Sequence, residues 1–252
     1  MKLTGRLLAF VIVTASVLVA CDAPPKRLTD EERATREAAR EAKRFADGEA
    51  AVEACKASYC ERLDLDGTRL NDFTVLNDMS HVKALMISRT NFANLSDIAN
   101  LTELQELHMS YTDVPDLNGL SAFSNLDILH MESLREKPSL EPLSTPALTG
   151  LVELALSPQK ENSIAFVTNM KSLKRLRFGY GEVGNLKPLS GHPSLEKLSS
   201  NADILQWQRG LLQLPRLKEF YVDYSMKNLD PGIRDALEEK GLLVYAPPMV
   251  MC

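Results

Sequence analysis

Residues 94–109 read Asn94-Leu95-Ser96-Asp97-Ile98-Ala99-Asn100-Leu101-Thr102-Glu103-Leu104-Gln105-Glu106-Leu107-His108-Met109, and this stretch decides the fold. Its apolar residues recur at every third position up to Leu107 and then at every second position, at Leu107 and Met109. A period near three is typical of a 3₁₀ or helical turn, and a period of two is typical of a short strand. The stretch therefore predicts a turn-rich segment that leads into a short strand.

The same unit recurs along the chain at a nearly fixed spacing. Its first strand positions are Leu63, Leu85, Leu107, Leu129, Leu154, Leu176, Leu198, Phe220 and Leu242. Neighbouring members are 22 residues apart, except that the step from Leu129 to Leu154 is three residues longer. A fixed period of this length indicates a solenoid, in which each unit buries its apolar face only by stacking on its neighbours. We expect eight to nine such units.

This pattern resembles the leucine-rich repeat, and its length and the stretch from Asn94 to Leu101 are most similar to the bacterial internalin-type variant. The resemblance covers roughly residues 60 to 245. It implies an α/β solenoid, a horseshoe arc with a parallel β-sheet on its concave face. A helical segment should precede the repeats, and a helix and strand, beginning at Asp230-Pro231 and including Gly241, should cap their C-terminal end.

The chain departs from the family at the buried asparagine that follows each strand. Thr68, Thr90 and Thr112 occupy this position in the first units, and Leu134 and Gly181 occupy it in later ones. A threonine hydroxyl supplies one donor and two acceptor lone pairs, so it can replace the asparagine in part, whereas leucine and glycine cannot. Together with the extra length and the prolines of residues 134–158, this predicts a distorted central repeat.

The N-terminus has the features of an export signal. Lys2 and Arg6 precede an apolar run from Leu7 to Val19, which is too short to span a bilayer. The run ends in Leu18-Val19-Ala20-Cys21, which resembles a bacterial lipobox. That resemblance implies that residues 1–20 are removed and that Cys21 is acylated, which would anchor the chain to a membrane of the bacterial cell envelope. A plain secreted protein is the alternative, and the choice of inner or outer membrane stays open.

Residues 21–54 are predicted to be the lipidated cysteine followed by a charged helical spacer. Thr29-Asp30-Glu31-Glu32 forms a capping box, and the apolar residues are too few for an independent core. A partner-docking helix is the alternative interpretation. The repeat domain with its caps is then expected over residues 55–245, with a tail over 246–252.

Composition and motifs exclude several classes of function. The precursor has 252 residues and a net charge of −5, with no basic stripe, so nucleic acid is not an expected partner. The sequence lacks a Walker loop, a G-x-S-x-G motif and an H-E-x-x-H motif. Gly179 to Gly184 fits G-x-G-x-x-G but lies in a repeat loop. We therefore expect neither an enzyme nor a cofactor.

Two cysteines flank the entry to the first strand. Cys55 and Cys60 are five residues apart, and they can pair only if the preceding helix ends between them. The sequence leaves open a disulfide or two buried thiols. Cys252 is the odd cysteine, either free or paired between molecules.

Function is expected on the concave sheet, where outward side chains lie on neighbouring strands about 4.8 Å apart. The candidate binding residues are Glu106, His108, Tyr111, His130, Glu132, Arg175, Arg177, Tyr180, Lys197, Tyr221, Asp223 and Tyr224. Tyrosine is favoured at interfaces, and charge is zoned, with acids and histidines in the middle units and Arg175, Arg177 and Lys197 beyond them. This pattern favours a protein partner.

Two other functions remain as alternatives. His108 and His130 lie on adjacent strands, but a flat sheet lacks the enclosing residues of a tight metal site, so no metal is predicted. A carbohydrate- or metal-dependent binder that uses Tyr111 and these histidines is one alternative. A structural envelope lipoprotein without a discrete ligand is the other.

Overall fold

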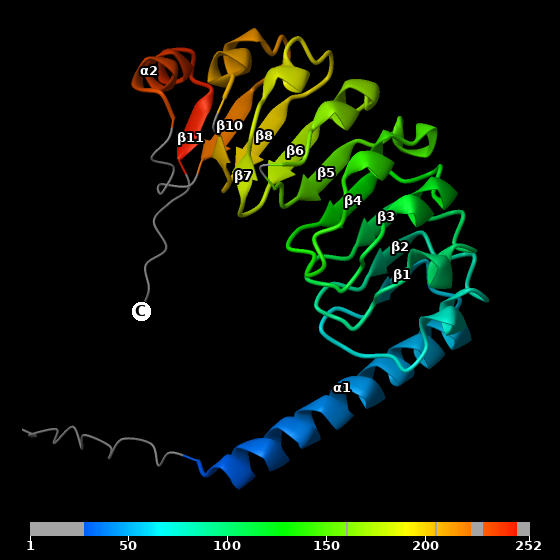
Figure 1. Cartoon of the computed structure of the whole chain (residues 1–252). Coiled ribbons are helices and arrows are strands. Elements are labelled where there is room, and N and C mark those ends of the chain that lie inside the picture. Colours follow the sequence, from blue (N-terminus) through cyan, green and yellow to red (C-terminus); the bar gives the residue numbers. More distant parts are fainter. Residues whose placement is uncertain (1–27, 160, 205, 223–228, 246–252) are drawn as a thin grey trace, which may run out of the picture. The chain divides into compact units, whose positions relative to one another are not determined.

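The computed structural model describes residues 28–159, 161–204, 206–222 and 229–245 (Figure 1). The chain divides into two compact units, Met1–Ala38 and Ala39–Cys252. The predicted signal peptide, Cys21, Asp223, Tyr224 and the tail at 246–252 lie outside the described residues. Within the described part, no helix has both the length and the apolar character that a bilayer crossing requires.

Nine parallel strands of the second unit form one sheet, in the order β1-β2-β3-β4-β5-β6-β8-β10-β11. They are β1 (Arg62–Asp64), β2 (Ala84–Met86), β3 (Glu106–His108), β4 (Ile128–Met131), β5 (Glu153–Leu156), β6 (Arg175–Phe178), β8 (Lys197–Ser200), β10 (Glu219–Val222) and β11 (Leu243–Tyr245). Figure 1 shows the sheet on the inner side of the curve and the helical return segments on its outer side. The predicted leucine-rich-repeat solenoid with a parallel concave sheet is confirmed.

Short 3₁₀ helices carry the chain back between strands. They are η1 (Phe73–Leu76), η2 (Leu95–Ile98), η3 (Asn118–Ala122), η4 (Glu141–Ser144), η5 (Pro146–Leu148), η6 (Ala165–Asn169), η7 (Lys187–Leu189) and η8 (Gln208–Gln213). The strand leucines and the apolar faces of these helices form one continuous core, in which Leu85, Leu107 and Leu129 are fully buried. A small second sheet, β7 (Glu182–Val183) with β9 (Asp203–Ile204), lies in the loops that follow β6 and β8.

The leucine register is as predicted from Leu63 to Phe220, but the last step is different. Phe220 pairs with Leu243, so the expectation that Leu242 falls in register was wrong by one residue. The return segment before β11 is the α-helix α2 (Pro231–Glu239) instead of a 3₁₀ helix. An α-helix advances about 1.5 Å per residue against about 2.0 Å for a 3₁₀ helix, so the same return needs more residues.

Hydrogen bonds from threonine replace part of the missing asparagine. The hydroxyls of Thr68 and Thr90 donate to the carbonyls of Leu65 and Ile87, both at 2.7 Å. Thr112 donates in the same way to Met109 at 2.6 Å. Each hydroxyl satisfies a carbonyl in the loop that closes its strand, as expected from the sequence.

Each of these threonines follows a residue in the left-handed conformation, and Ser133 takes the same position before Leu134. The loops keep this conformation up to Ser133 and lose it in the next unit. Gly67, Arg89, Tyr111 and Ser133 have φ between 54° and 72°. Pro158 occupies the same position in the next unit, and the proline ring holds φ near −65°. Ser133 N–H accordingly donates to the Ser157 hydroxyl, at 3.0 Å, whereas Tyr111 N–H donates to a backbone carbonyl. The central repeat is therefore distorted in part because its loop has Pro158 where the earlier loops have a left-handed residue.

Helices lie at both ends of the described chain. In α1 (Asp30–Ser58), Thr29 and Glu32 exchange the two hydrogen bonds of the predicted capping box. The C-terminal third of α1 buries Val52 and Cys55 in the repeat core. In α2, the Asp230 carboxylate accepts a hydrogen bond from Ile233 N–H, and Ile233 and Leu237 are buried. Both helices therefore cover apolar surface that a terminal repeat would otherwise expose to solvent.

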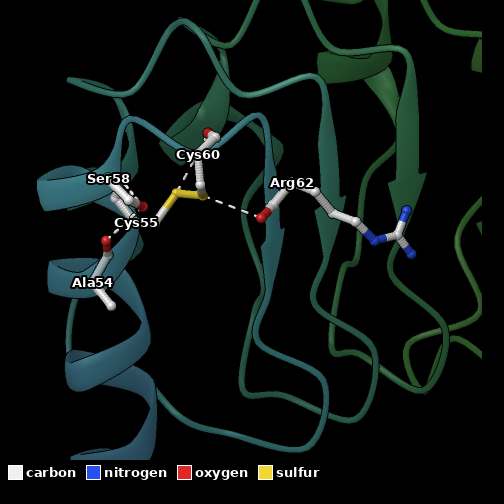
Figure 2. Close-up of a disulfide and its surroundings, with 5 residues drawn as sticks. All are labelled: Ala54, Cys55, Ser58, Cys60 and Arg62. Carbon is white, nitrogen blue, oxygen red and sulfur yellow. Dashed lines mark hydrogen bonds between the residues drawn. A yellow bond between two sulfur atoms is a disulfide. The ribbon is translucent and has the colours of Figure 1, made fainter.

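Cys55 and Cys60 form a disulfide that ties α1 to the first strand (Figure 2). Their Cα atoms are 4.9 Å apart, within the range that a disulfide requires. The helix ends at Ser58, and Tyr59 adopts a left-handed conformation with φ of 55°, which turns the chain back toward Cys55. The two cysteines thus meet because the helix stops between them.

Candidate functional site

Two rows of outward side chains run across the concave sheet. The first row is Arg62, Ala84, Glu106, Ile128, Glu153, Arg175, Lys197 and Glu219, and the second is Asp64, Met86, His108, His130, Ala155, Arg177, Ser199 and Tyr221. Neighbours in a row occupy paired positions on adjacent strands, because the leucines between the rows hold the register. Most of the predicted binding residues lie in these rows, and Tyr111, Glu132 and Tyr180 lie in the loops just beyond the strands.

The middle of the sheet carries a continuous ladder of charged and imidazole groups. Arg62 Nη1 lies 2.9 Å from Glu106 Oε2, and Glu106 Oε1 lies 2.9 Å from His108 Nε2. The His108 contact is close but does not have hydrogen-bond geometry. The His108 and His130 rings contact each other with their centroids 4.2 Å apart and their planes tilted by 37°.

The ladder continues on the other side of His130. His130 Nε2 lies 2.9 Å from Glu153 Oε1, and Arg175 Nε donates to Glu153 Oε2. Glu153 therefore joins the histidine pair to β6. The ladder therefore links six side chains on strands from β1 to β6, namely Arg62, Glu106, His108, His130, Glu153 and Arg175.

Electrostatics in this ladder favour a neutral His108. Burial lowers the pKa of His108, and the adjacent His130 lowers it further, against the raising effect of Glu106. Burial acts to raise the pKa of Glu153, but the hydrogen bonds from Arg175 and His130 outweigh it, so this pKa is lowered. Glu153 therefore stays ionised and His108 resists protonation.

A second set of ion pairs surrounds the end of β6. Arg177 Nη2 donates to Glu132 Oε2 at 2.5 Å, which spans β5 at the small residue Ala155. Gly179 leaves room for this contact, because a Cβ at that position would lie 3.1 Å from Glu132 Oε1 and 2.6 Å from Ser157 Oγ. Glu132 therefore neutralises part of the positive charge that was expected around Arg177.

Lys197 and Tyr221 share one carboxylate at the next strands. Lys197 Nζ lies 2.7 Å from Glu219 Oε2, a close contact without hydrogen-bond geometry, and Tyr221 is a second neighbour of this carboxylate. The neighbouring Lys197 and Tyr221 lower the pKa of Glu219, and Glu219 in turn raises the pKa of Tyr221. Lys197 and Tyr221 thus share Glu219 as a neighbour.

The two loop tyrosines are exposed at the rim of the sheet. Arg89 lies over the Tyr111 ring, with its guanidinium carbon 5.1 Å from the ring centroid. Tyr180 borders a cavity of about 510 Å³ beside the irregular unit, together with Ser157, Pro158 and Gly181. This cavity lies where Pro158 interrupts the regular loop pattern.

Sequence reasoning missed Glu153, which joins the histidines to Arg175. A signal was present, because Glu153 precedes Leu154 as Glu106 precedes Leu107. The same register rule that selected Glu106 would have selected it. Within the described residues, no group of three or more histidine, cysteine or acidic side chains is arranged to hold a metal ion.

The free energy of unfolding is expected to fall when the pH is lowered from 7.5 to 5.5. Burial lowers the folded-state pKa of both His108 and His192 from 6.5, so the unfolded chain takes up protons first. The two neutral histidines therefore make their full contribution to stability above pH 6.5. This contribution is lost as the pH falls below 6.5, and it amounts to about 1.4 kcal/mol for each unit by which folding lowers a pKa.

Urea unfolding at several pH values measures this slope. His192 is buried and its Nε2 lies 3.2 Å from the Val167 carbonyl, so a His192→Gln variant should show a flatter pH dependence. A variant whose slope equals that of the parent would show that His192 does not contribute.

A comparison with known protein families and with curated proteins finds no match. Solved structures of internalins from Listeria monocytogenes are similar in fold. One, InlF, has a TM-score of 0.58 and 19% identity, over 75% of this chain and 56% of that chain. Internalin C2 has a TM-score of 0.57 and 17% identity, over 74% of this chain and 80% of the other. This chain thus spans little more than half the length of InlF, and the similarity establishes the repeat fold.

Proposed function

We propose that this chain is an exported bacterial lipoprotein that binds another protein through the concave face of its sheet. The carrying observation is the ladder from Arg62 to Arg175, which fixes arginine and histidine side chains on a broad parallel sheet. Arginine and tyrosine are the residues enriched in the energetic centres of protein interfaces. Side chains that are already held in place lose less entropy when a partner binds.

The membrane anchor rests on the sequence alone. Cys21 ends a lipobox-like signal, and two or three acyl chains hold a protein on a membrane durably. The charged segment that follows would then separate the repeats from the bilayer. The protein acts by binding in this proposal, because the fold itself specifies no reaction and the same solenoid serves many ligands.

Affinity capture from native envelope extracts tests the proposal. The bait is the chain from residue 22 onward, compared with a bait that carries Arg175→Glu, Arg177→Glu and Tyr221→Ala. The control bait carries Arg135→Glu, since Arg135 is an exposed arginine that pairs with Asp113 in a loop beyond the strands. All baits must have matched thermal stability.

The expected result is one protein that the parent and the control bait recover and that the concave variant loses at least tenfold. Recovery of the same proteins by all three baits would place binding away from the concave face. In cells, the Cys21→Ser change is expected to release the chain from the membrane fraction, and continued membrane association would contradict the lipid anchor.

A further inference from the structure

The ion pairs of the concave strands share one orientation. In the pairs Arg62–Glu106, Arg175–Glu153, Arg177–Glu132 and Lys197–Glu219, the cationic side chains are 45–59% exposed and the carboxylates 18–33%. The carboxylates thus lie beneath and the cations above. A partner that approaches the sheet meets the positive side of each pair first.

Three of these cations lie together on two neighbouring strands. Arg175 and Arg177 are two residues apart on β6 and point to the same face, and Arg175 is in register with Lys197 on β8. Adjacent strands are about 4.8 Å apart. The opposite end of the face differs, since Asp64 and Asp66 are exposed there and bond only to backbone N–H groups of the described residues. The face is therefore mixed in charge at β1, where Asp64 and Asp66 lie near Arg62, and basic at β6 and β8.

Both arginines retain unused donors. A guanidinium group has five N–H donors in a planar fork that matches a carboxylate. Arg175 uses Nε for Glu153 and Arg177 uses Nη2 for Glu132, and neither guanidinium group forms another hydrogen bond within the described residues. The less exposed carboxylates of Glu132 and Glu153 hold both side chains in place, so a second carboxylate can bind from above without ordering them.

We propose that Arg175, Arg177 and Lys197 form a docking site for an acidic segment of the partner protein, whose side-chain carboxylates bind the outward donors. This rests on the proposed function and specifies the chemistry of its partner. Protein carboxylates fit better than a dense polyanion, because Glu132, Glu153 and Glu219 lie just below the cations and the whole chain is acidic.

Fluorescence anisotropy with a labelled peptide of alternating glutamate and serine tests the site. The purified full-length chain in nonionic detergent is expected to bind this peptide saturably, and added salt should weaken the binding. An Arg175→Gln/Arg177→Gln variant should bind at least tenfold more weakly. The Arg135→Gln variant, which removes an exposed and paired arginine elsewhere, should bind as the parent does, and a peptide with glutamine in place of glutamate should not bind.

Equal binding by the parent and the Arg175→Gln/Arg177→Gln variant would overturn the assignment, and so would the absence of binding. Binding of a heparin-derived oligosaccharide without binding of the peptide would also overturn it and assign the cations to a sulfated glycan. If envelope capture still finds a partner that depends on the concave face while the peptide fails, only the acidic chemistry is wrong. If both experiments fail, the proposed function fails as well.

Discussion

Replacing Thr90 by valine is expected to lower the free energy of unfolding by about 2–6 kcal/mol, although the two side chains have nearly the same shape. The Thr90 hydroxyl is buried, donates to the Ile87 carbonyl at 2.7 Å and accepts from Phe92 N–H at 3.2 Å. Valine would leave both backbone groups buried without a partner, at about 1–3 kcal/mol each. The lost bonds, instead of lost packing, therefore set the size of the effect.

Two matched variants make this prediction specific. Thr112→Val removes one donated bond from a buried site, to the Met109 carbonyl, and should cost about 1–3 kcal/mol. Thr68 makes the corresponding bond to Leu65, but the Leu65 carbonyl also accepts a hydrogen bond from Thr68 N–H at 2.9 Å, so it keeps a partner and the cost should be smaller. Urea unfolding monitored by circular dichroism gives all three values. Equal losses in Thr90→Val and Thr68→Val would show that the buried hydroxyl is not a substitute for the family asparagine.

The fold could be predicted because each repeat encodes its own register. A leucine at the first strand position fixes which side chains face the core, and a slip by one residue would expose the whole set. This rule placed Leu63 through Phe220 correctly. It failed at Leu242 because the last return segment is α-helical, and the number of residues in a return depends on the helix type.

The candidate site could be predicted less fully. The register placed His108 beside His130 and Arg175 beside Lys197, as the paired strands show. The choice of ion-pair partners was not predictable, because it depends on small residues between the charges. Arg62 reaches Glu106 across the row position of Ala84. The pattern of charged residues in the sequence also does not show which side chain of an ion pair is more exposed to solvent.

Gly48→Ala is expected to destabilise the protein by about 1–2 kcal/mol, against the direction that helix propensity predicts. Glycine inside a helix is about 0.5–1 kcal/mol worse than alanine, so the propensity of α1 alone would favour the substitution. A Cβ at Gly48 would, however, lie 2.3 Å from the Arg69 carbonyl oxygen and 3.1 Å from Leu70 Cδ2. Arg69 N–H is itself bonded to the Arg44 carbonyl, so this backbone cannot move without disturbing the same helix.

The clash therefore forces α1 away from the first repeat, where Val52 and Cys55 complete the core. Ala46→Gly is the control, because Ala46 lies on the exposed side of the same helix and reports propensity alone, with an expected loss of about 1 kcal/mol. Urea unfolding compares the two variants with the parent. If Gly48→Ala stabilises the protein by the amount that Ala46→Gly destabilises it, the close approach of α1 to Arg69 does not exist in solution.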